Sequence, residues 1–589
     1  MANQWNIVIG TLVPAVTCQV LVIQPAMAEL FVAYPPANHT TTSDQIFFIG
    51  TGAPDGDVLI NGTPITERSP AGHFAPTLPL ALGQNRFTQT QGDETIILNI
   101  TRSSLEPPQP NGIAFAEGTL EPANSLARQP GELICFSAVA PPQAQVAVNL
   151  ADQTIPLLTA QNNSIELPPN YAVLTEQTEP YTLSATQYGG CATFNQPRNF
   201  GSPDFQLTLN GQTITQAGNG PIEILSPTTF QVAEVTVDSG IARTGPSTDY
   251  SRLTPLPKGT RAAVTGRDGN WVRLDYGAWI RASEVSISPS PVPPTTTIRG
   301  IRSRQTPEWI EVIFPLQVPV PMSVEQDTSS LTLILHNTVP QTDTIYFSDD
   351  PVVERMDWQP ILPDKASYTF HFKTEQQWGY KLHYEGTNLI LSLKHPPAVD
   401  ATAAPLQGTT ILLDPGHGSS EDLGARGPNG YPEKDVALLI SKLVRDELEA
   451  LGASVVMVRE GDDDLFPRDR VAVINETEPT MALSLHYNAL PDNGDALNTA
   501  GIGAFWYHPQ AHDLALFLHN HLVETLDRPA YGVYWNNLAL TRPSVTPSVL
   551  LELGFMINPY EFEWIVDSEA QQQLAKALAD GVAEWVASR

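Results

Sequence analysis

The spacing of apolar residues changes once along the chain, near Thr409. From residue 33 to residue 395, short apolar runs and strict alternation are separated by Gly, Pro and Asn-Gly, a pattern typical of strands and turns. After Thr409, short apolar runs alternate with segments of helical periodicity, the first of which runs from Val436 to Leu451 and ends at Gly452. We therefore predict a multidomain chain in which several all-β modules precede a C-terminal α/β domain, with a mixed twisted sheet covered by helices on both faces.

Composition supports this division and excludes one class of partner. The 53 prolines among 589 residues favour β-domains, turns and stiff linkers over helical bundles. Charged residues make up 16 % of the chain against a usual ~25 %, so disorder driven by charge is not expected. The net charge of −32 excludes binding to nucleic acid through a basic surface, because such binding depends on Lys and Arg contacts with phosphates.

The N-terminus has the pattern of a secretory signal peptide. Residues 7–23 are apolar, and Ala26-Met27-Ala28 forms an A-x-A cleavage pattern before Glu29. Residues 1–28 are therefore predicted to be removed on export to the periplasm or cell wall, with no stable transmembrane anchor after cleavage. The first five residues contain no Lys or Arg, so an uncleaved membrane anchor stays open as an alternative, although the apolar run is shorter than the ~20 residues of a membrane span.

The exported chain would retain two cysteines, Cys135 and Cys191, since Cys18 lies in the predicted signal peptide. Two cysteines in an exported protein can form one disulfide. The sequence leaves a disulfide and two buried free thiols equally open.

The β-rich part of the chain divides into modules at changes of pattern. Residues 33–102 resemble bacterial immunoglobulin-like β-sandwiches, with an Asn-Gly turn at Asn61, a Gly-x-Phe step at Gly72 and a Gly-x-Asn step at Gly83. Residues 111–228 are predicted to form a second β-domain. Residues 288–298 and 396–408 are rich in Pro, Thr, Ser or Ala and are predicted to be linkers on either side of a further β-rich module, residues 299–395.

Residues 229–287 resemble bacterial SH3 modules. The resemblance depends on Gly245-Pro246-Ser247, which makes a tight turn, and on Trp271 and Trp279 in two predicted strands. Such modules commonly bind cell-wall peptides, and a plain spacer is the alternative.

Polar residues that can bind a metal follow three apolar runs of the C-terminal domain. His417 comes after the strand at 411–413, His486 after the strand at 482–485, and Glu552 lies at the end of the strand at 549–551. Because ligands of open α/β sheets bind beyond the carboxyl ends of strands, these side chains are expected to share one site. Glu433, at the start of the first predicted helix, is expected to join them.

Two histidines and one carboxylate are a common ligand set of catalytic zinc, with one position left for water. We predict that one Zn²⁺ is bound by His417, Glu433 and His486, although another divalent ion could fill the same ligand set. Glu552 would then serve as general base and general acid for amide hydrolysis. An isolated carboxylate in an apolar strand is otherwise hard to explain, because its burial is costly.

The segments that carry these residues resemble zinc-dependent N-acetylmuramoyl-L-alanine amidases of the type 3 family. The matching motifs are DPGHGS (414–419), GPNGYPEKDVAL (427–438), SLHYNA (484–489) and PSVLLELGFMIN (547–558), all in the family's order within 409–589. The resemblance implies a zinc amidase domain with metal ligands His417, Glu433 and His486 and catalytic Glu552. It also implies that four further residues order the site or touch substrate: Arg470, Asn475, Asn488 and Arg542.

Two features set this chain apart within the resemblance. Tyr487 stands where the family usually has Ala, and beside a ligand it is expected to narrow or line the cleft. The helical insertion that plugs the site in division amidases has no room here, because a predicted helix at 512–526 follows Gly503–Tyr507 closely. An open catalytic domain is expected. Residues 299–395, placed before such a domain, resemble AMIN-type modules that bind the wall.

The resemblance implies a cell-wall hydrolase that cleaves the amide between N-acetylmuramic acid and L-alanine of peptidoglycan, for cell separation, wall remodelling or septal perforation. Peptidoglycan is the expected partner, with divisome or septal proteins as further candidates. One alternative is a wall-binding architectural protein with an inactive amidase domain. Another is a metallohydrolase that acts on a different amide, such as a cross-link peptide bond.

Overall fold

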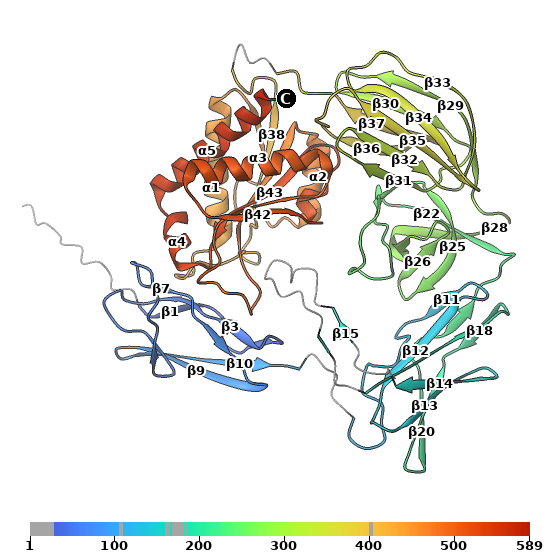
Figure 1. The fold of residues 1–589 in the computed structure, drawn as a ribbon, viewed down its shortest axis with the longest axis horizontal. Coiled ribbons are helices and arrows are strands. Elements are labelled where there is room, and N and C mark those ends of the chain that lie inside the picture. Colours follow the sequence, from blue (N-terminus) through green and yellow to red (C-terminus); the bar gives the residue numbers. More distant parts are fainter. Residues whose placement is uncertain (1–28, 105–109, 160–164, 168–180, 183–185, 400–403) are drawn as a thin grey trace, which may run out of the picture.

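The computed structural model describes residues 29–104, 110–159, 165–167, 181–182, 186–399 and 404–589 (Figure 1). The predicted signal peptide, residues 1–28, lies outside these ranges. None of the helices within them is both long and apolar enough to span a membrane.

The first module is built from strands only. They form a three-stranded sheet β1-β4-β7, a five-stranded sheet β2-β10-β9-β5-β6 and the pair β3-β8, packed around Phe48, Phe87 and Ile100. Their bounds are β1 Phe31–Tyr34, β2 His39–Thr41, β3 Gln45–Phe47, β4 Ile49–Thr51, β5 Leu59–Ile60, β6 Thr63–Pro64, β7 His73–Phe74, β8 Thr77–Pro79, β9 Gly83–Gln91 and β10 Glu94–Arg102.

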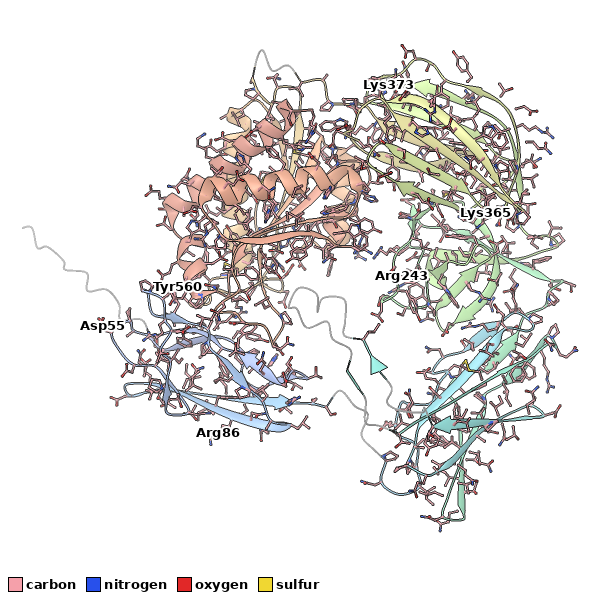
Figure 2. All side chains as sticks on the ribbon, in the orientation of Figure 1. Asp55, Arg86, Arg243, Lys365, Lys373 and Tyr560 are labelled. Carbon is pink, nitrogen blue, oxygen red and sulfur yellow. A yellow bond between two sulfur atoms is a disulfide. The ribbon has the colours of Figure 1, made fainter. Side chains whose placement is uncertain are left out.

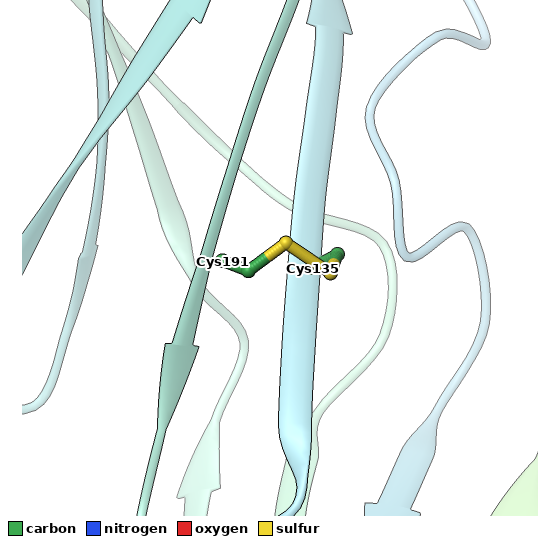
Figure 3. The surroundings of a disulfide bond; sticks show 2 residues. All are labelled: Cys135 and Cys191. Carbon is green, nitrogen blue, oxygen red and sulfur yellow. A yellow bond between two sulfur atoms is a disulfide. The ribbon is translucent and has the colours of Figure 1, made fainter.

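The second β-rich region contains a six-stranded sheet, β12-β17-β14-β13-β19-β20, and a pair, β15-β16. Its strands are β11 Leu126–Arg128, β12 Leu133–Val139, β13 Gln145–Leu150, β14 Gln153–Thr159, β15 Ile165–Glu166, β16 Tyr181–Thr182, β17 Gln187–Thr193, β18 Arg198–Gly201, β19 Asp204–Leu209, β20 Gln212–Ala217 and β21 Ile222–Ile224. Cys135 on β12 faces Cys191 on β17, and the two form a disulfide (Figure 3). Of the two alternatives that the sequence left open, the structure therefore has the disulfide.

The SH3-type module shares a sheet with the region before it. Its strands are β22 Phe230–Val235, β23 Ser239–Gly240, β24 Leu256–Pro257, β25 Arg261–Asp268, β26 Trp271–Leu274, β27 Trp279–Arg281 and β28 Val285–Ser290, with a 3-10 turn, η2, at Ala282–Glu284. β11 pairs with β25, so one sheet crosses the boundary expected at residues 228 and 229. The expected linker 288–298 is also shorter, because β28 pairs with β22 as far as Ser290 and β29 begins at Thr296.

Residues 299–395 belong to a module of two facing sheets, β33-β29-β30-β37-β36 and β31-β32-β35-β34. Phe314, Tyr368, Phe370 and Leu391 fill its core, which is continuous with that of the SH3-type module. The strands are β29 Thr296–Gln305, β30 Trp309–Pro315, β31 Met322–Gln326, β32 Ser330–Leu335, β33 Thr338–Tyr346, β34 Val353–Ile361, β35 Lys365–Phe372, β36 Tyr380–Glu385 and β37 Asn388–Lys394.

The C-terminal domain is a six-stranded mixed sheet with helices on both faces (Figure 1). The order is β39-β38-β40-β43-β41-β42, in which only β41 and β43 pair antiparallel. Helices α1, α3 and α5 pack on one face through Ile440, Leu518 and Leu578, and α2 packs on the other through Ile474, which confirms the predicted α/β layout. The elements are β38 Thr410–Pro415, α1 Glu433–Ala450, β39 Ser454–Met457, α2 Pro467–Thr477, β40 Met481–Asn488, β41 Ile502–Trp506, α3 Pro509–Leu526, β42 Ala530–Trp535, η3 Ala539–Thr541, β43 Ser548–Phe555, α4 Pro559–Ile565 and α5 Ser568–Ala587.

Two different modules contact the opposite ends of this sheet. The first module packs Phe47 and Ile49 against Phe555, the last residue of β43, and against Ile557 just after it. Beside this contact, the Tyr560 hydroxyl donates to the Arg68 carbonyl, and Figure 2 shows Tyr560 at the boundary between the two domains.

At the other end, the module formed by residues 299–395 binds the segment that precedes β40. The indole of Trp309 donates to the Glu478 carboxylate (3.1 Å), and the Lys394 ammonium donates to the carbonyls of Glu478 (2.7 Å) and Pro479 (2.5 Å). The C-terminal domain is thus held at both ends by β-modules.

Candidate active site

Three metal-competent side chains meet where β38, β40 and α1 come together. His417 follows β38, His486 lies near the end of β40, and Glu433 is the first residue of α1. One ligand atom from each lies within 4.8 Å of the others, as expected from the sequence. His417 adopts the left-handed conformation (φ 56°), which is uncommon for residues other than Gly.

The carboxylate of Glu433 is the centre of this cluster. Its Oε1 lies 3.0 Å from His486 Nδ1 and its Oε2 lies 3.1 Å from His417 Nε2. The same oxygens accept hydrogen bonds from the backbone N–H groups of Tyr487 (3.0 Å) and Ala425 (2.8 Å). Glu433 is buried, with 3 % of its surface exposed, so its position is set by four contacts rather than by solvent.

The contacts within the cluster favour positive charge on its histidines. Burial raises the pKa of Glu433, but hydrogen bonds with His417 and His486 outweigh it and lower the pKa to about 2. Burial lowers the pKa of His417, but hydrogen bonds with Glu433 and Asp422 raise it to about 9. A buried carboxylate that raises the pKa of both neighbouring imidazoles is an environment that also stabilises a cation. Two nitrogens and one carboxylate oxygen fit zinc with an open coordination position.

Glu552 lies at the same end of the sheet, opposite His486 in the register of β40 and β43. Burial raises the pKa of its carboxyl to about 7. The negative charge of Glu433 also raises this pKa, whereas the charges of His486 and His417 lower it. Its buried Oε2 accepts no hydrogen bond from any residue that the structure describes. A buried carboxyl with a free oxygen and a pKa near neutrality is suited to accept and return a proton.

Arg470, which the resemblance implies orders the site or touches substrate, binds the loop that carries His417. From α2, its guanidinium donates to the Asp414 carboxylate (2.6 Å), to the Pro415 carbonyl (2.7 Å) and to the carbonyl of His417. The Ser484 hydroxyl donates to the other oxygen of Asp414 (2.6 Å), which ties the loop to β40.

Two residues of the site were missed from the sequence. Arg459 is 2 % exposed and donates to the carbonyls of Pro415 (3.0 Å), Gly416 (2.8 Å) and Lys434 (2.7 Å). Its place just after β39 (Ser454–Met457) is a usable signal, because that strand ends at the same edge of the sheet. Asp422 lies 2.6 Å from His417 Nδ1, and nothing in its loop sequence marks that contact.

The remaining predicted residues are not all near this cluster. Asn488 ends β40, and its side chain accepts from the Ala489 N–H (2.8 Å). Asn475 is exposed on α2, about one and a half turns beyond Arg470.

Arg542 lies at the opposite end of the sheet, so the expectation that it orders or lines the site at the strand ends is corrected. β41 runs antiparallel to β43, which places Gly503 beside Glu552 and sends Trp506 and the residues after it to the far end. There His508 Nε2 lies 2.8 Å from the Arg542 carbonyl. The segment sequence does not reveal the direction of β41, which decides where Arg542 lies.

Tyr487 does not line the cleft, which also differs from expectation. It is 2 % exposed and packs in the core beneath the helices. Successive side chains of a strand point to opposite faces, so a residue next to a ligand on β40 is directed into the core.

Comparison with known proteins identifies two parts of the chain. The family model described as N-acetylmuramoyl-L-alanine amidase matches residues 411–584, and the bacterial SH3 domain model matches residues 238–286. The germination-specific N-acetylmuramoyl-L-alanine amidase of Bacillus subtilis is 32 % identical over 203 residues, which are 31 % of this chain and 81 % of that protein. The probable cell wall amidase LytH of Staphylococcus epidermidis is 31 % identical over 220 residues, which are 37 % of this chain and 70 % of that protein.

Solved structures of similar sequence include an N-acetylmuramoyl-L-alanine amidase from Clostridium difficile 630. It is 28 % identical, and the match covers 31 % of this chain and 98 % of that one, with a TM-score of 0.29. AmiC2 of Nostoc punctiforme is 30 % identical over 31 % of this chain and 98 % of its own, also with a TM-score of 0.29. The identity and coverage of the Bacillus relative, together with the matched segment 411–584, show that the chain belongs to the N-acetylmuramoyl-L-alanine amidase family.

Proposed function

We propose that this chain is a zinc-dependent peptidoglycan amidase in which His417, Glu433 and His486 hold the metal and Glu552 transfers the proton. The observation that carries the proposal is the buried Glu433 carboxylate between two histidines, with the free oxygen of Glu552 at the same strand ends. The scissile bond is the amide between the lactyl group of N-acetylmuramic acid and L-alanine.

The chemistry follows from the two kinds of group in the site. When bound, zinc supplies Lewis-acid polarisation of the carbonyl and activation of water. Glu552 takes the proton of the attacking water as the new C–O bond forms, and it gives that proton to the nitrogen as the C–N bond breaks. Arg470 and Arg459 hold the loop of His417 in place throughout, because both bind its carbonyl groups.

The modular organisation supports a role outside the cell. We propose export to the periplasm or cell wall and a part in cell separation, wall remodelling or septal perforation, with divisome or septal proteins as candidate partners. The complete His417–Glu433–His486 set with Glu552 disfavours an architectural protein with an inactive domain.

The function is tested with the chain from residue 29 and purified peptidoglycan, with products identified by mass spectrometry. We expect stem peptides with a free L-alanine amino terminus, which disappear after chelation and return when zinc is added. Cleavage in the glycan or in a cross-link peptide bond, or no product from a folded, zinc-loaded chain, would contradict the proposal.

Asp422→Asn is expected to weaken zinc binding about 10- to 100-fold. The Asp422 carboxylate accepts from Nδ1 of His417, which leaves the Nε2 lone pair directed at the metal position. Competition with a chromophoric chelator measures the change. Asp446→Asn, on the exposed side of α1, is the matched control, and equal zinc affinity of the two variants would refute the role of Asp422.

A further inference from the structure

A second cavity lies where three modules meet, at the end of the sheet opposite to Glu552. Its volume is about 550 Å³, in the range of small-molecule sites. The SH3-type module contributes Arg252, strand β31 contributes Glu325, and the catalytic domain contributes Tyr507, Trp535 and Arg542. Figure 2 shows Arg243, a neighbour of this group, on the side of the SH3-type module that faces the catalytic domain.

The two arginines of this cavity form no ion pair with any residue that the structure describes. Within the described part of the chain, neither Arg252 nor Arg542 pairs with a carboxylate, and Arg542 donates only to the side chain (2.7 Å) and carbonyl (3.0 Å) of Asn537. Burial and the nearby charge of Arg252 lower the pKa of Arg542 to about 10. Among the residues that the structure describes, Glu325 is the one acidic residue that lines the cavity. Two half-buried arginines without a carboxylate partner favour an anionic ligand here.

A rigid aromatic surface lies beside the two arginines. The rings of Tyr507 and Trp535 are stacked, with centroids 5.3 Å apart and planes at 30°. Trp535 is 61 % exposed, yet its indole N–H is fixed by the Tyr507 carbonyl (3.0 Å). An exposed aromatic side chain that is already held in place binds apolar parts of a ligand with little loss of side-chain entropy.

We infer that this three-module cavity is a second peptidoglycan site. Arg252 and Arg542 bind the carboxylate groups of a stem peptide there, and Trp535 binds the apolar part of the same peptide. The choice of ligand rests on the proposed function, because peptidoglycan, the proposed substrate, carries repeated peptides with free carboxylate groups. Guanidinium groups match carboxylates in geometry. Binding one stem peptide here raises the effective concentration of its neighbours at the catalytic site. The site requires the catalytic domain as well as the SH3-type module.

Calorimetric titration of the chain from residue 29 with a synthetic stem tetrapeptide tests the inference. The peptide has no muramic acid, so no amide turnover accompanies binding. We expect Arg252→Gln, Arg542→Gln and Trp535→Ala each to lower affinity about tenfold or more. Arg261→Gln, an exposed arginine of the same module that pairs with Glu234, is the matched control and should bind as the unaltered chain does.

A peptide with amidated carboxyl groups should bind at least about tenfold more weakly than the acid form. Equal affinity of all variants would overturn the inference, as would a loss confined to Arg252→Gln, which would place binding on the SH3-type module alone. Displacement of the peptide by glycerol phosphate at equal concentration would show a general anion site and overturn the choice of ligand. If Arg542→Gln does not fold, Trp535→Ala decides, since that side chain is mostly exposed. The binding result is independent of amidase activity, so failure of the proposed function is seen separately, as absence of released stem peptides.

Discussion

Replacing Glu552 with Gln is expected to lower kcat for amide hydrolysis about 10²- to 10⁴-fold while zinc stays bound. Gln keeps the shape of the side chain but cannot accept the proton of the attacking water or return it to the leaving nitrogen. Release of stem peptides, followed by mass spectrometry, measures the loss, and metal analysis of the same sample shows that the ligand set is intact. Glu449→Gln, on the exposed side of α1, is the control.

The same substitution is expected to stabilise the metal-free protein at pH 8. Burial raises the pKa of Glu552 to about 7, above its unfolded value, so ionisation opposes folding as the pH rises between the two values. Gln cannot ionise, so at pH 8 the midpoint of thermal unfolding of the metal-free variant should be higher than that of the unaltered chain. A variant that keeps full kcat, or that unfolds at markedly lower temperature at pH 8, would contradict the assignment of Glu552.

His417→Asn is expected to abolish stoichiometric zinc binding and to lower activity about 10²-fold or more, because Lewis-acid stabilisation of several kcal/mol is lost. Asn is chosen because it tolerates the left-handed conformation of residue 417 better than Ala does. Zinc content after gel filtration and the peptide-release assay measure the two effects. His383→Asn, in strand β36, is the matched control, and retention of zinc by His417→Asn would exclude His417 as a ligand.

The zinc affinity of the unaltered chain should also increase with pH up to about 9. Without metal, contacts with Glu433 and Asp422 raise the pKa of His417 to about 9, so below that pH zinc must displace a proton. Titrations of the unaltered chain below pH 9, in buffers of different ionisation enthalpy, should show proton release on zinc binding, and its absence would contradict the prediction.

The four central residues of the site could be predicted because each has a local signal. His417, His486 and Glu552 interrupt or follow apolar strands, and parallel strands bring their carboxyl ends together. Arg542 could not be placed in the same way, because its position depends on the antiparallel direction of β41, a property of the sheet rather than of the segment. Asp422 has no local signal at all, since its contact with His417 is formed by the path of a loop.

The arrangement of the β-modules shows the same limit. Alternation of apolar residues predicted strands throughout 33–395, but the pairing of β11 with β25 joins residues 126 and 268, which no local pattern connects. The two cysteines were equally open to pairing until β12 and β17 placed them opposite each other. Long-range pairing therefore decided what residue spacing left undetermined.

The loop that carries His417 is fixed by contacts within the protein itself. Arg459 and Arg470 bind its carbonyl groups, and Asp414 links it to β40, so protein contacts alone hold this loop beside Glu433 and His486. Small zinc domains that are disordered without metal must order their backbone as they bind, and chelators unfold them. Here the conformational entropy of the loop is lost when the domain folds. Under the proposed function, chelation is therefore expected to switch the catalytic domain off reversibly without denaturing it.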